Sequence, residues 1–105
     1  MAVDTEATKI VSKAYADDVK RAMAVDKVVL YGSYAKGTAT ELSDIDICFF
    51  LPDFGGKRRV DIIVSLLTIS GKYKGIFFEP TAFPTSEIAR GNPFVKEILE
   101  SGIEI

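Results

Sequence analysis

Two short apolar segments, joined by a polar stretch, constrain the fold of this chain more than any other feature. The first, residues 27–31, is rich in β-branched and aromatic side chains and ends at Gly32. The second, residues 44–51, opens with Asp44 and Asp46 and is otherwise almost wholly apolar. Both have the length and composition of buried strands. We therefore expect two strands of one sheet, with a brief helix from Ser33 to Gly37 in the polar stretch between them.

Hydrophobic periodicity and turn residues predict the other elements. These are a helix over residues 5–24, a helix over 57–70 (or a strand there), a strand over 75–81, a helical turn from Thr85 or Ser86, a helix from Pro93 to Gly102 and a short strand at 103–105. The apolar face predicted for the 57–70 helix consists of Val60, Ile63, Val64 and Leu67, with Leu66 as a further candidate. Pro80 predicts that the 75–81 strand lies at a sheet edge or ends there. Helices alternating with short strands predict an α/β fold of two or three layers.

The length and composition limit what kind of protein this can be. A chain of 105 residues is expected to form one domain, residues 1–105. It contains no histidine, which excludes histidine acid–base chemistry and histidine zinc sites, and its single cysteine, Cys48, cannot form an internal disulfide. The net charge of −2, without a long basic run, argues against direct nucleic-acid binding. No segment resembles a signal peptide or a membrane span, so we expect a cytoplasmic protein.

Asp44 and Asp46 are the strongest candidates for catalytic chemistry. Alternation along a strand places them on one face with Cys48, about 6.5–7 Å apart at their Cα atoms. Two neighbouring carboxylates repel each other unless a cation lies between them. Oxygen ligands without histidine or cysteine suit Mg²⁺, and a pair of such ions can hold a phosphate during in-line attack. The pair therefore predicts a magnesium site.

Gly32 and Ser33 supply a complementary feature. A glycine directly after a strand lets the backbone approach a ligand closely. Ser33 opens the brief helix, where free N–H groups favour phosphate oxygens, and Lys36 is close enough in sequence to face the same anion. These three residues are candidates for nucleotide binding.

A two-metal site needs a third carboxylate, and two residues compete for that position. Glu79 lies in an apolar strand, where an unpaired charge would be costly, and it is the preferred candidate. Asp61 follows a basic run, residues 57–59, on the predicted helix, where a surface ion pair accounts for it more simply.

Taken together, these residues resemble the nucleotidyltransferase superfamily that includes DNA polymerase beta, and especially its minimal nucleotidyltransferase (MNT) branch. The signature of that family is Gly-Ser, ten residues, then Asp-x-Asp, which here is Gly32-Ser33 followed by Asp44-Ile45-Asp46. The flanking residues 34–37 and Ser43 also match this branch, and the segment 92–103 is similar to the end of small members.

The resemblance implies a small mixed β-sheet flanked by helices and transfer of a nucleoside monophosphate, most simply AMP from ATP, to a hydroxyl group. Asp44, Asp46 and Glu79 would be the catalytic and metal-binding residues for Mg²⁺, with Glu79 as ligand or base. Gly32, Ser33 and Lys36 would bind the triphosphate.

The resemblance also implies a partner, because larger members carry a second domain that recognises the acceptor. We expect a separate helical, HEPN-type protein or a second copy of the chain to present the acceptor. Minimal nucleotidyltransferases are often the antitoxin of a HEPN toxin. The alternative is a non-catalytic, nucleotide-binding protein that neutralises such a partner by binding alone.

Overall fold

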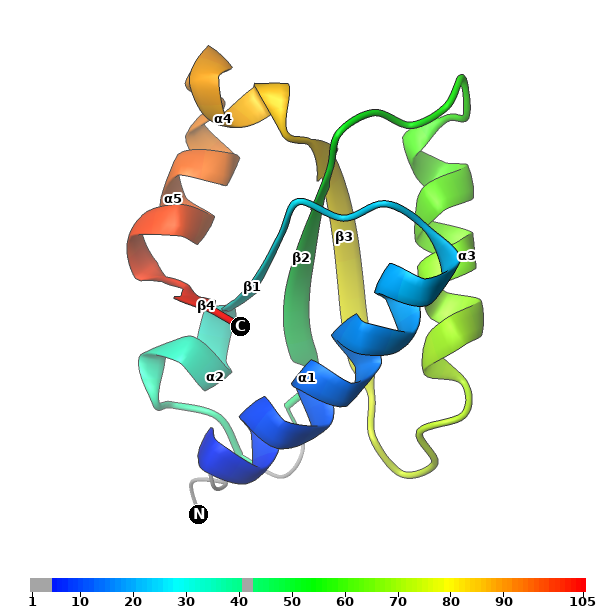
Figure 1. The fold of residues 1–105 in the computed structure, drawn as a ribbon. Helices are drawn as coiled ribbons and strands as arrows, with labels where there is room; N and C mark the ends of the chain where they lie inside the picture. The colour runs from blue at the N-terminus through cyan, green and yellow to red at the C-terminus, as the bar shows by residue number, and fades with distance from the viewer. Residues whose placement is uncertain (1–4, 41–42) are drawn as a thin grey trace.

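The computed structural model describes residues 5–40 and 43–105 and contains helices and strands in alternation (Figure 1). In chain order the elements are α1 (Thr5–Ala22), β1 (Lys27–Tyr31), α2 (Gly32–Lys36), β2 (Ile45–Leu51), α3 (Arg59–Ser70), β3 (Phe78–Pro84), α4 (Ser86–Arg90), α5 (Pro93–Ser101) and β4 (Ile103–Glu104). Among the described residues, no helix has both the length and the apolar character needed to cross a bilayer.

The four strands form one mixed sheet in the order β3-β2-β1-β4. β1 runs antiparallel to both β2 and β4, whereas β2 and β3 are parallel. The predicted class of fold, a small mixed sheet flanked by helices, is therefore confirmed. β3 is an edge strand, as the position of Pro80 predicts, because a proline cannot donate a hydrogen bond to a further strand.

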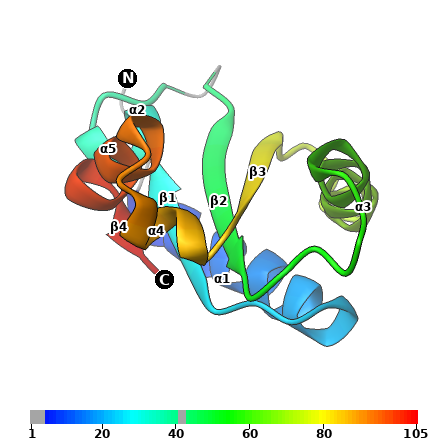
Figure 2. The same ribbon diagram turned by 90° about the horizontal axis from the view of Figure 1, so that it is seen from above.

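Helices cover both faces of the sheet and enclose two apolar clusters. In Figure 1 α1 crosses in front of the strands, and in Figure 2 α5 lies next to β1 while α3 lies next to β3. On the α1 face, the ring of Tyr15 packs edge-on against Phe49 at 5.5 Å, and its hydroxyl donates to the carbonyl of Leu66 at 2.7 Å. On the other face, Phe50 belongs to a buried cluster that Ile98 and Val95 of α5 cover.

The segment over residues 59–70 is a helix, and the strand considered as its alternative does not form. Its buried face was predicted wrongly, however, except for the further candidate Leu66. Ile62 and Leu66 point into the core, whereas Val60, Val64 and Leu67 are exposed. The reason is that apolar residues occur on two opposite sides of this helix, so periodicity alone cannot indicate which of them packs on the sheet.

The boundaries of two strands also differ from the prediction. β3 covers residues 78–84 instead of 75–81, because Gly75 has a φ of +81° and the N–H of Ile76 bonds back to the carbonyl of Tyr73 in a turn. β2 begins at Ile45, one residue after Asp44. Both shifts leave Asp46 and Glu79 inside strands, so the candidate site is not displaced.

Candidate active site

Asp46 and Glu79 lie side by side on neighbouring strands. The parallel register of β2 and β3 pairs Asp46 with Glu79, so the two carboxyl groups lie on the same face of the sheet. Asp44 lies immediately before β2, and its negative charge acts on Asp46. The structure thus brings together the three acidic residues that the sequence singled out.

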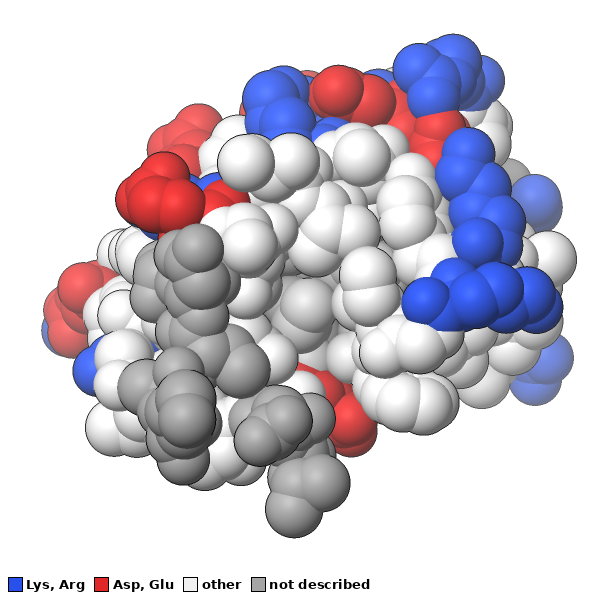
Figure 3. Space-filling view, turned by 90° about the horizontal axis from the view of Figure 1, so that it is seen from below, with Lys and Arg blue, Asp and Glu red and all other residues white. Residues whose placement is uncertain are grey.

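The surroundings of Asp46 disfavour its charged form. Its pKa is raised from 3.8 to about 6, first by burial, then by the charge of Glu79, the hydrogen bond with Glu79 and the charge of Asp44. Figure 3 looks onto this end of the molecule, where acidic side chains show in a small recess at the lower centre and lysines and arginines gather at the right-hand edge. A cation placed between these carboxylates would relieve their repulsion and favour the charged form of Asp46.

Gly32 approaches this acidic cluster so closely that any side chain added there would force the Asp46 carboxylate to move. Its φ is +69°, and a Cβ atom built on it would lie 2.2 Å from Oδ2 of Asp46. The backbone at the end of β1 therefore lies directly against the carboxylate, as the antiparallel pairing of Tyr31 with Asp46 requires. Ser33 follows as the second residue of α2. The Gly-Ser half of the signature therefore lies directly beside its Asp-x-Asp half.

A cavity of about 210 Å³ opens beside Gly32, between α2 and α5. Gly32 and Lys36 line it on one side, so the structure places these two candidates for nucleotide binding together. Tyr31 and the α5 residues Phe94, Glu97, Ile98 and Ser101 complete the wall. The roles of Gly32, Ser33 and Lys36 in binding a nucleotide remain predictions.

Asp61, the competitor for the third acidic position, lies away from the cluster. It is the third residue of α3, where its carboxylate accepts hydrogen bonds from the backbone N–H of Arg58 at 3.1 Å and from the guanidinium of Arg58 at 3.2 Å. These bonds hold the pKa of Asp61 below its usual range. They close the first turn of the helix, which gives Asp61 a structural role.

Sequence reasoning missed two residues that face the same side of the sheet. The hydroxyl of Tyr31 has its pKa raised by burial and then by the charges of Asp46, Cys48 and Glu79, so it lies close to the carboxylates. Arg59 reaches over the edge of β3, donates from Nε to the carbonyl of Ala82 at 2.8 Å and lies 4.4 Å above the Phe83 ring.

The sequence contains a signal that could have identified Tyr31, but none that could have identified Arg59. Strand alternation from Val29 could have placed Tyr31 on the face that carries Asp46. No local pattern indicates Arg59, because its contacts lie more than 20 residues away along the chain. Its guanidinium also donates to the hydroxyl of Thr81 and lowers the pKa of Tyr31, so it adds a fixed positive charge to the face that carries the site.

The donor set fits a hard divalent cation. Within residues 5–40 and 43–105, no three aspartate, glutamate or cysteine side chains already surround a common point. Asp46 and Glu79 are nevertheless register partners on neighbouring strands, and Asp44 is near enough to act on Asp46 electrostatically. All three offer oxygen ligands, which Mg²⁺ prefers. The one thiol on this face, Cys48, is fully buried with its pKa raised to about 12, so it offers neither a soft ligand nor a nucleophile.

A mixed sheet that presents paired acids beside a glycine turn defines a class of phosphate-transferring enzyme, and comparison with known families gives the family. The model of the nucleotidyltransferase domain family matches residues 11–104, so the chain belongs to that family. The match is consistent with the minimal branch and supports transfer of a nucleoside monophosphate as the general activity. A search of curated proteins found no match.

Proposed function

We propose that this protein is a Mg²⁺-dependent nucleotidyltransferase that transfers AMP from ATP to a hydroxyl group of a partner protein. The observation that carries the proposal is the contact between the two signature halves. The Gly32 backbone lies against Asp46, and Glu79 is the register partner of Asp46 on the neighbouring strand. A triphosphate bound at Gly32 would therefore lie beside the carboxylates.

The proposed reaction is an in-line displacement at the α-phosphorus. The acceptor oxygen bonds to that phosphorus, the bond to the bridging oxygen breaks, and pyrophosphate leaves. Asp44, Asp46 and Glu79 hold Mg²⁺, which supplies positive charge to the phosphate oxygens when bound. Glu79 is a ligand or else accepts the hydroxyl proton, and its exposed position suits either role. Gly32, Ser33 and Lys36 bind and orient the triphosphate.

The proposed acceptor belongs to a helical HEPN-type toxin, which the chain neutralises as its antitoxin. The family match supports the transfer chemistry, and the resemblance to minimal nucleotidyltransferases supports the pairing. The described residues form a compact sheet and its flanking helices, and the acceptor is expected from outside them.

Transfer of label from [α-³²P]ATP to the protein encoded by the neighbouring gene tests the proposal. We expect Mg²⁺-dependent labelling that Asp44→Asn, Asp46→Asn and Glu79→Gln each abolish. Asp61→Asn is the matched control, because it removes an equivalent charge from a carboxylate away from the cluster and should keep full activity. If Glu79→Gln were as active as the wild type and Asp61→Asn inactive, the assignment of the third carboxylate would be overturned.

Neutralisation by binding alone is the second candidate, and the exposed apolar residues of α3 favour it. The two candidates differ in one outcome. A partner that remains neutralised by the Asp44→Asn/Asp46→Asn double variant is neutralised by binding, whereas loss of neutralisation together with labelling identifies the modification as the cause.

A further inference from the structure

Helix α3 is apolar on its outer side as well as on its inner side. Ile62 and Leu66 fill the core, yet Val60, Val64 and Leu67, one turn apart on the opposite side, are exposed by 52%, 56% and 47%. A helix that packs on a core with one side normally carries polar residues on the opposite side. The outer side of α3 therefore has the composition of an interface instead of a solvated surface.

Helix α1 packs on the same face of the sheet and shows what a solvated helix of this protein looks like. Its outer side carries ion pairs one turn apart, Lys9 with Glu6 at 3.4 Å and Lys13 with Asp17 at 3.3 Å. The charged residues of α3 are confined to its first turn, where Arg59 contacts β3 and Asp61 caps the helix. The absence of charge from the rest of α3 is thus a property of this helix and not of the protein's surfaces generally.

Two apolar grooves extend the outer side of α3. Val64 borders a groove of about 550 Å³, whose other walls include Met23 and Phe54. Leu67 borders a second groove of about 310 Å³ near Phe77, which is 72% exposed. We name the surface formed by Val60, Val64 and Leu67 with these grooves the α3 face. It offers both a ridge and hollows for the side chains of an occupant.

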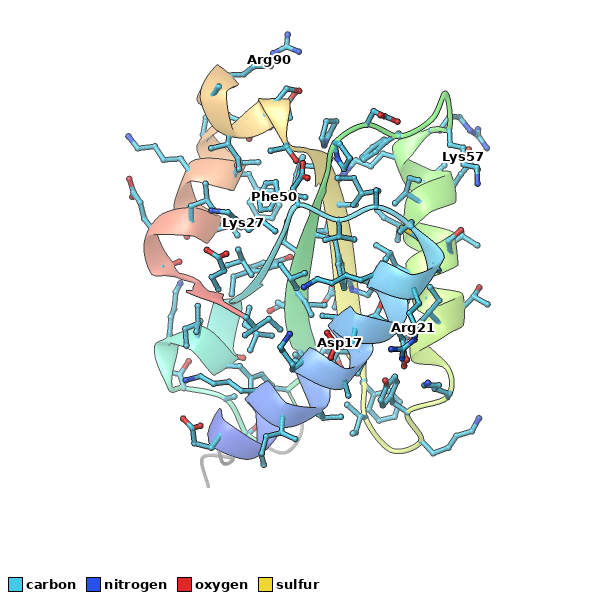
Figure 4. All side chains as sticks on the ribbon, in the orientation of Figure 1. Asp17, Arg21, Lys27, Phe50, Lys57 and Arg90 are labelled. Carbon is cyan, nitrogen blue, oxygen red and sulfur yellow. The ribbon has the colours of Figure 1, made fainter. Side chains whose placement is uncertain are left out.

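Positive charge flanks the α3 face at both ends. Lys57 precedes the helix and Lys74 follows it, whereas their neighbours Arg58 and Lys72 are already paired with Asp61 and Asp18. Figure 4 shows Lys57 at the upper end of α3. A second copy of the chain packed through this face, in either direction, would bring basic ends together, and like charges at an interface are costly. The complementary occupant is apolar along one side and acidic at both ends.

We propose that the α3 face docks an amphipathic helix of a separate protein, with acidic residues at both ends of that helix. The inference deepens the proposed function, since it assigns the surface that holds the partner. Only the biological purpose of the docking rests on the proposed function, and the docking itself does not. α3 is 12 residues long, or about 18 Å, which matches roughly three turns of a docked helix.

Fluorescence anisotropy with two synthetic peptides tests the proposal. Both have about 18 residues, leucines at helical spacing and either glutamates or lysines at their ends. We expect the full chain, without nucleotide or Mg²⁺, to bind the glutamate-ended peptide at least about tenfold more tightly than the lysine-ended one. Val64→Glu and Leu67→Glu should each weaken that binding at least about tenfold.

The control variant is Ile10→Glu. Ile10 is 73% exposed on α1, so this change adds the same charge at a still more exposed apolar position outside the α3 face and should leave binding unchanged. Lys57→Glu/Lys74→Glu should abolish the preference for the acidic peptide. Circular dichroism melting of each variant confirms that it is folded.

Three outcomes would overturn the proposal. The first is no saturable binding of the glutamate-ended peptide, or binding that Val64→Glu does not weaken. The second is self-association of the wild type in sedimentation that Val64→Glu abolishes, which assigns the face to a second copy. The third is co-sedimentation with phosphatidylglycerol vesicles that Val64→Glu abolishes. Asp46→Asn should bind the peptide like the wild type, so failure of catalysis and failure of docking are separable.

Discussion

Asp18 and Asp46 are both partly enclosed carboxylates, yet the protein treats them in opposite ways. Asp18, on α1, accepts hydrogen bonds from Lys72 at 2.6 Å, from Tyr73 and from Arg21, and the Lys72 bond above all lowers its pKa to about 2. Burial and two neighbouring acids raise the pKa of Asp46 to about 6. The fold stabilises the charge of Asp18 and penalises that of Asp46.

This difference separates a structural carboxylate from a candidate catalytic one. The cations around Asp18 come from α1 and from the turn after α3, so the chain supplies everything that this group needs. Asp46 is surrounded by groups of its own sign, and the cation that would stabilise its charge must come from outside. Active sites commonly sacrifice stability in this way.

The largest effect is expected from Asp46→Asn on nucleotidyl transfer. Loss of a group that holds charge at the reacting phosphate typically costs about 10²–10³-fold in rate, and we expect at least that loss. Initial rates of label transfer from ATP measure it. Asp18→Asn, measured in parallel, should keep the wild-type rate, and a comparable loss in both variants would remove the distinction between the two carboxylates.

Gly32→Ala should have the next largest effect. The variant combines a strained φ of +69° with a Cβ atom 2.2 Å from Asp46, and we expect about 2–4 kcal/mol of destabilisation together with weakened ATP binding. Gly37→Ala is the matched control, because Gly37 has a φ of +74° but a Cβ there meets nothing within 4 Å. Urea unfolding of both variants isolates the cost of the contact with Asp46, and equal losses would argue against that contact.

Removing the charge of Asp46 should stabilise the protein in the absence of metal. Because the folded-state pKa is raised above the ordinary value of 3.8, the contribution of Asp46 is most favourable below pH 4 and declines as the pH rises through about 6. At pH 7 we expect Asp46→Asn to be more stable by about 1 kcal/mol, a value discounted from the full shift because the carboxyl is partly exposed.

Thermal unfolding of the wild type and Asp46→Asn between pH 4 and 8 measures this difference. The two curves should converge near pH 4. Millimolar Mg²⁺ at pH 7 should raise the Tm of the wild type more than that of the variant, since a bound cation offsets the repulsion. A wild type more stable than the variant at pH 7 without metal would contradict the raised pKa.

Asp18→Asn should give the smallest effect, with the opposite sign. The folded-state pKa of Asp18 is lowered, so its stabilising contribution is present above about pH 4 and is lost as the pH falls toward 2. The Tm of Asp18→Asn should lie below that of the wild type at pH 7, and the gap should close toward pH 2. A gap that persists unchanged at pH 2 would show that the charge is not its cause.

The pairing of Asp46 with Glu79 could be anticipated from the sequence because two local rules pointed to it. Strand alternation placed Asp46 on a defined face, and an unpaired glutamate in the apolar segment Phe77-Phe78-Glu79-Pro80 needed an explanation. Neither rule depends on knowing the topology. The mixed sheet itself came from the family resemblance, which carries long-range information that periodicity lacks.

The orientation of α3 and the position of Arg59 could not be predicted, since both depend on contacts far apart in the chain. With apolar residues on two opposite sides, α3 satisfies the helical pattern whichever of them packs inward. In the sequence, Arg59 is one of three consecutive basic residues. Its side chain turns back onto β3, where it contacts the Phe83 ring and the Ala82 carbonyl. Only the packing of α3 beside β3 distinguishes it from its neighbours.

Because β2 and β3 pair in parallel, the candidate site depends on the residue register between the two strands. It does not depend on the length of the connection between them. The connection that returns from Leu51 to Phe78 runs through α3, and its loops can lengthen or shorten without moving either carboxylate. A slip of β3 by a single residue is different, because it would set Phe78 or Pro80 beside Asp46 and turn Glu79 to the opposite face. Insertions in the connection should therefore be tolerated, whereas one residue gained or lost within β3 should eliminate the paired acids outright.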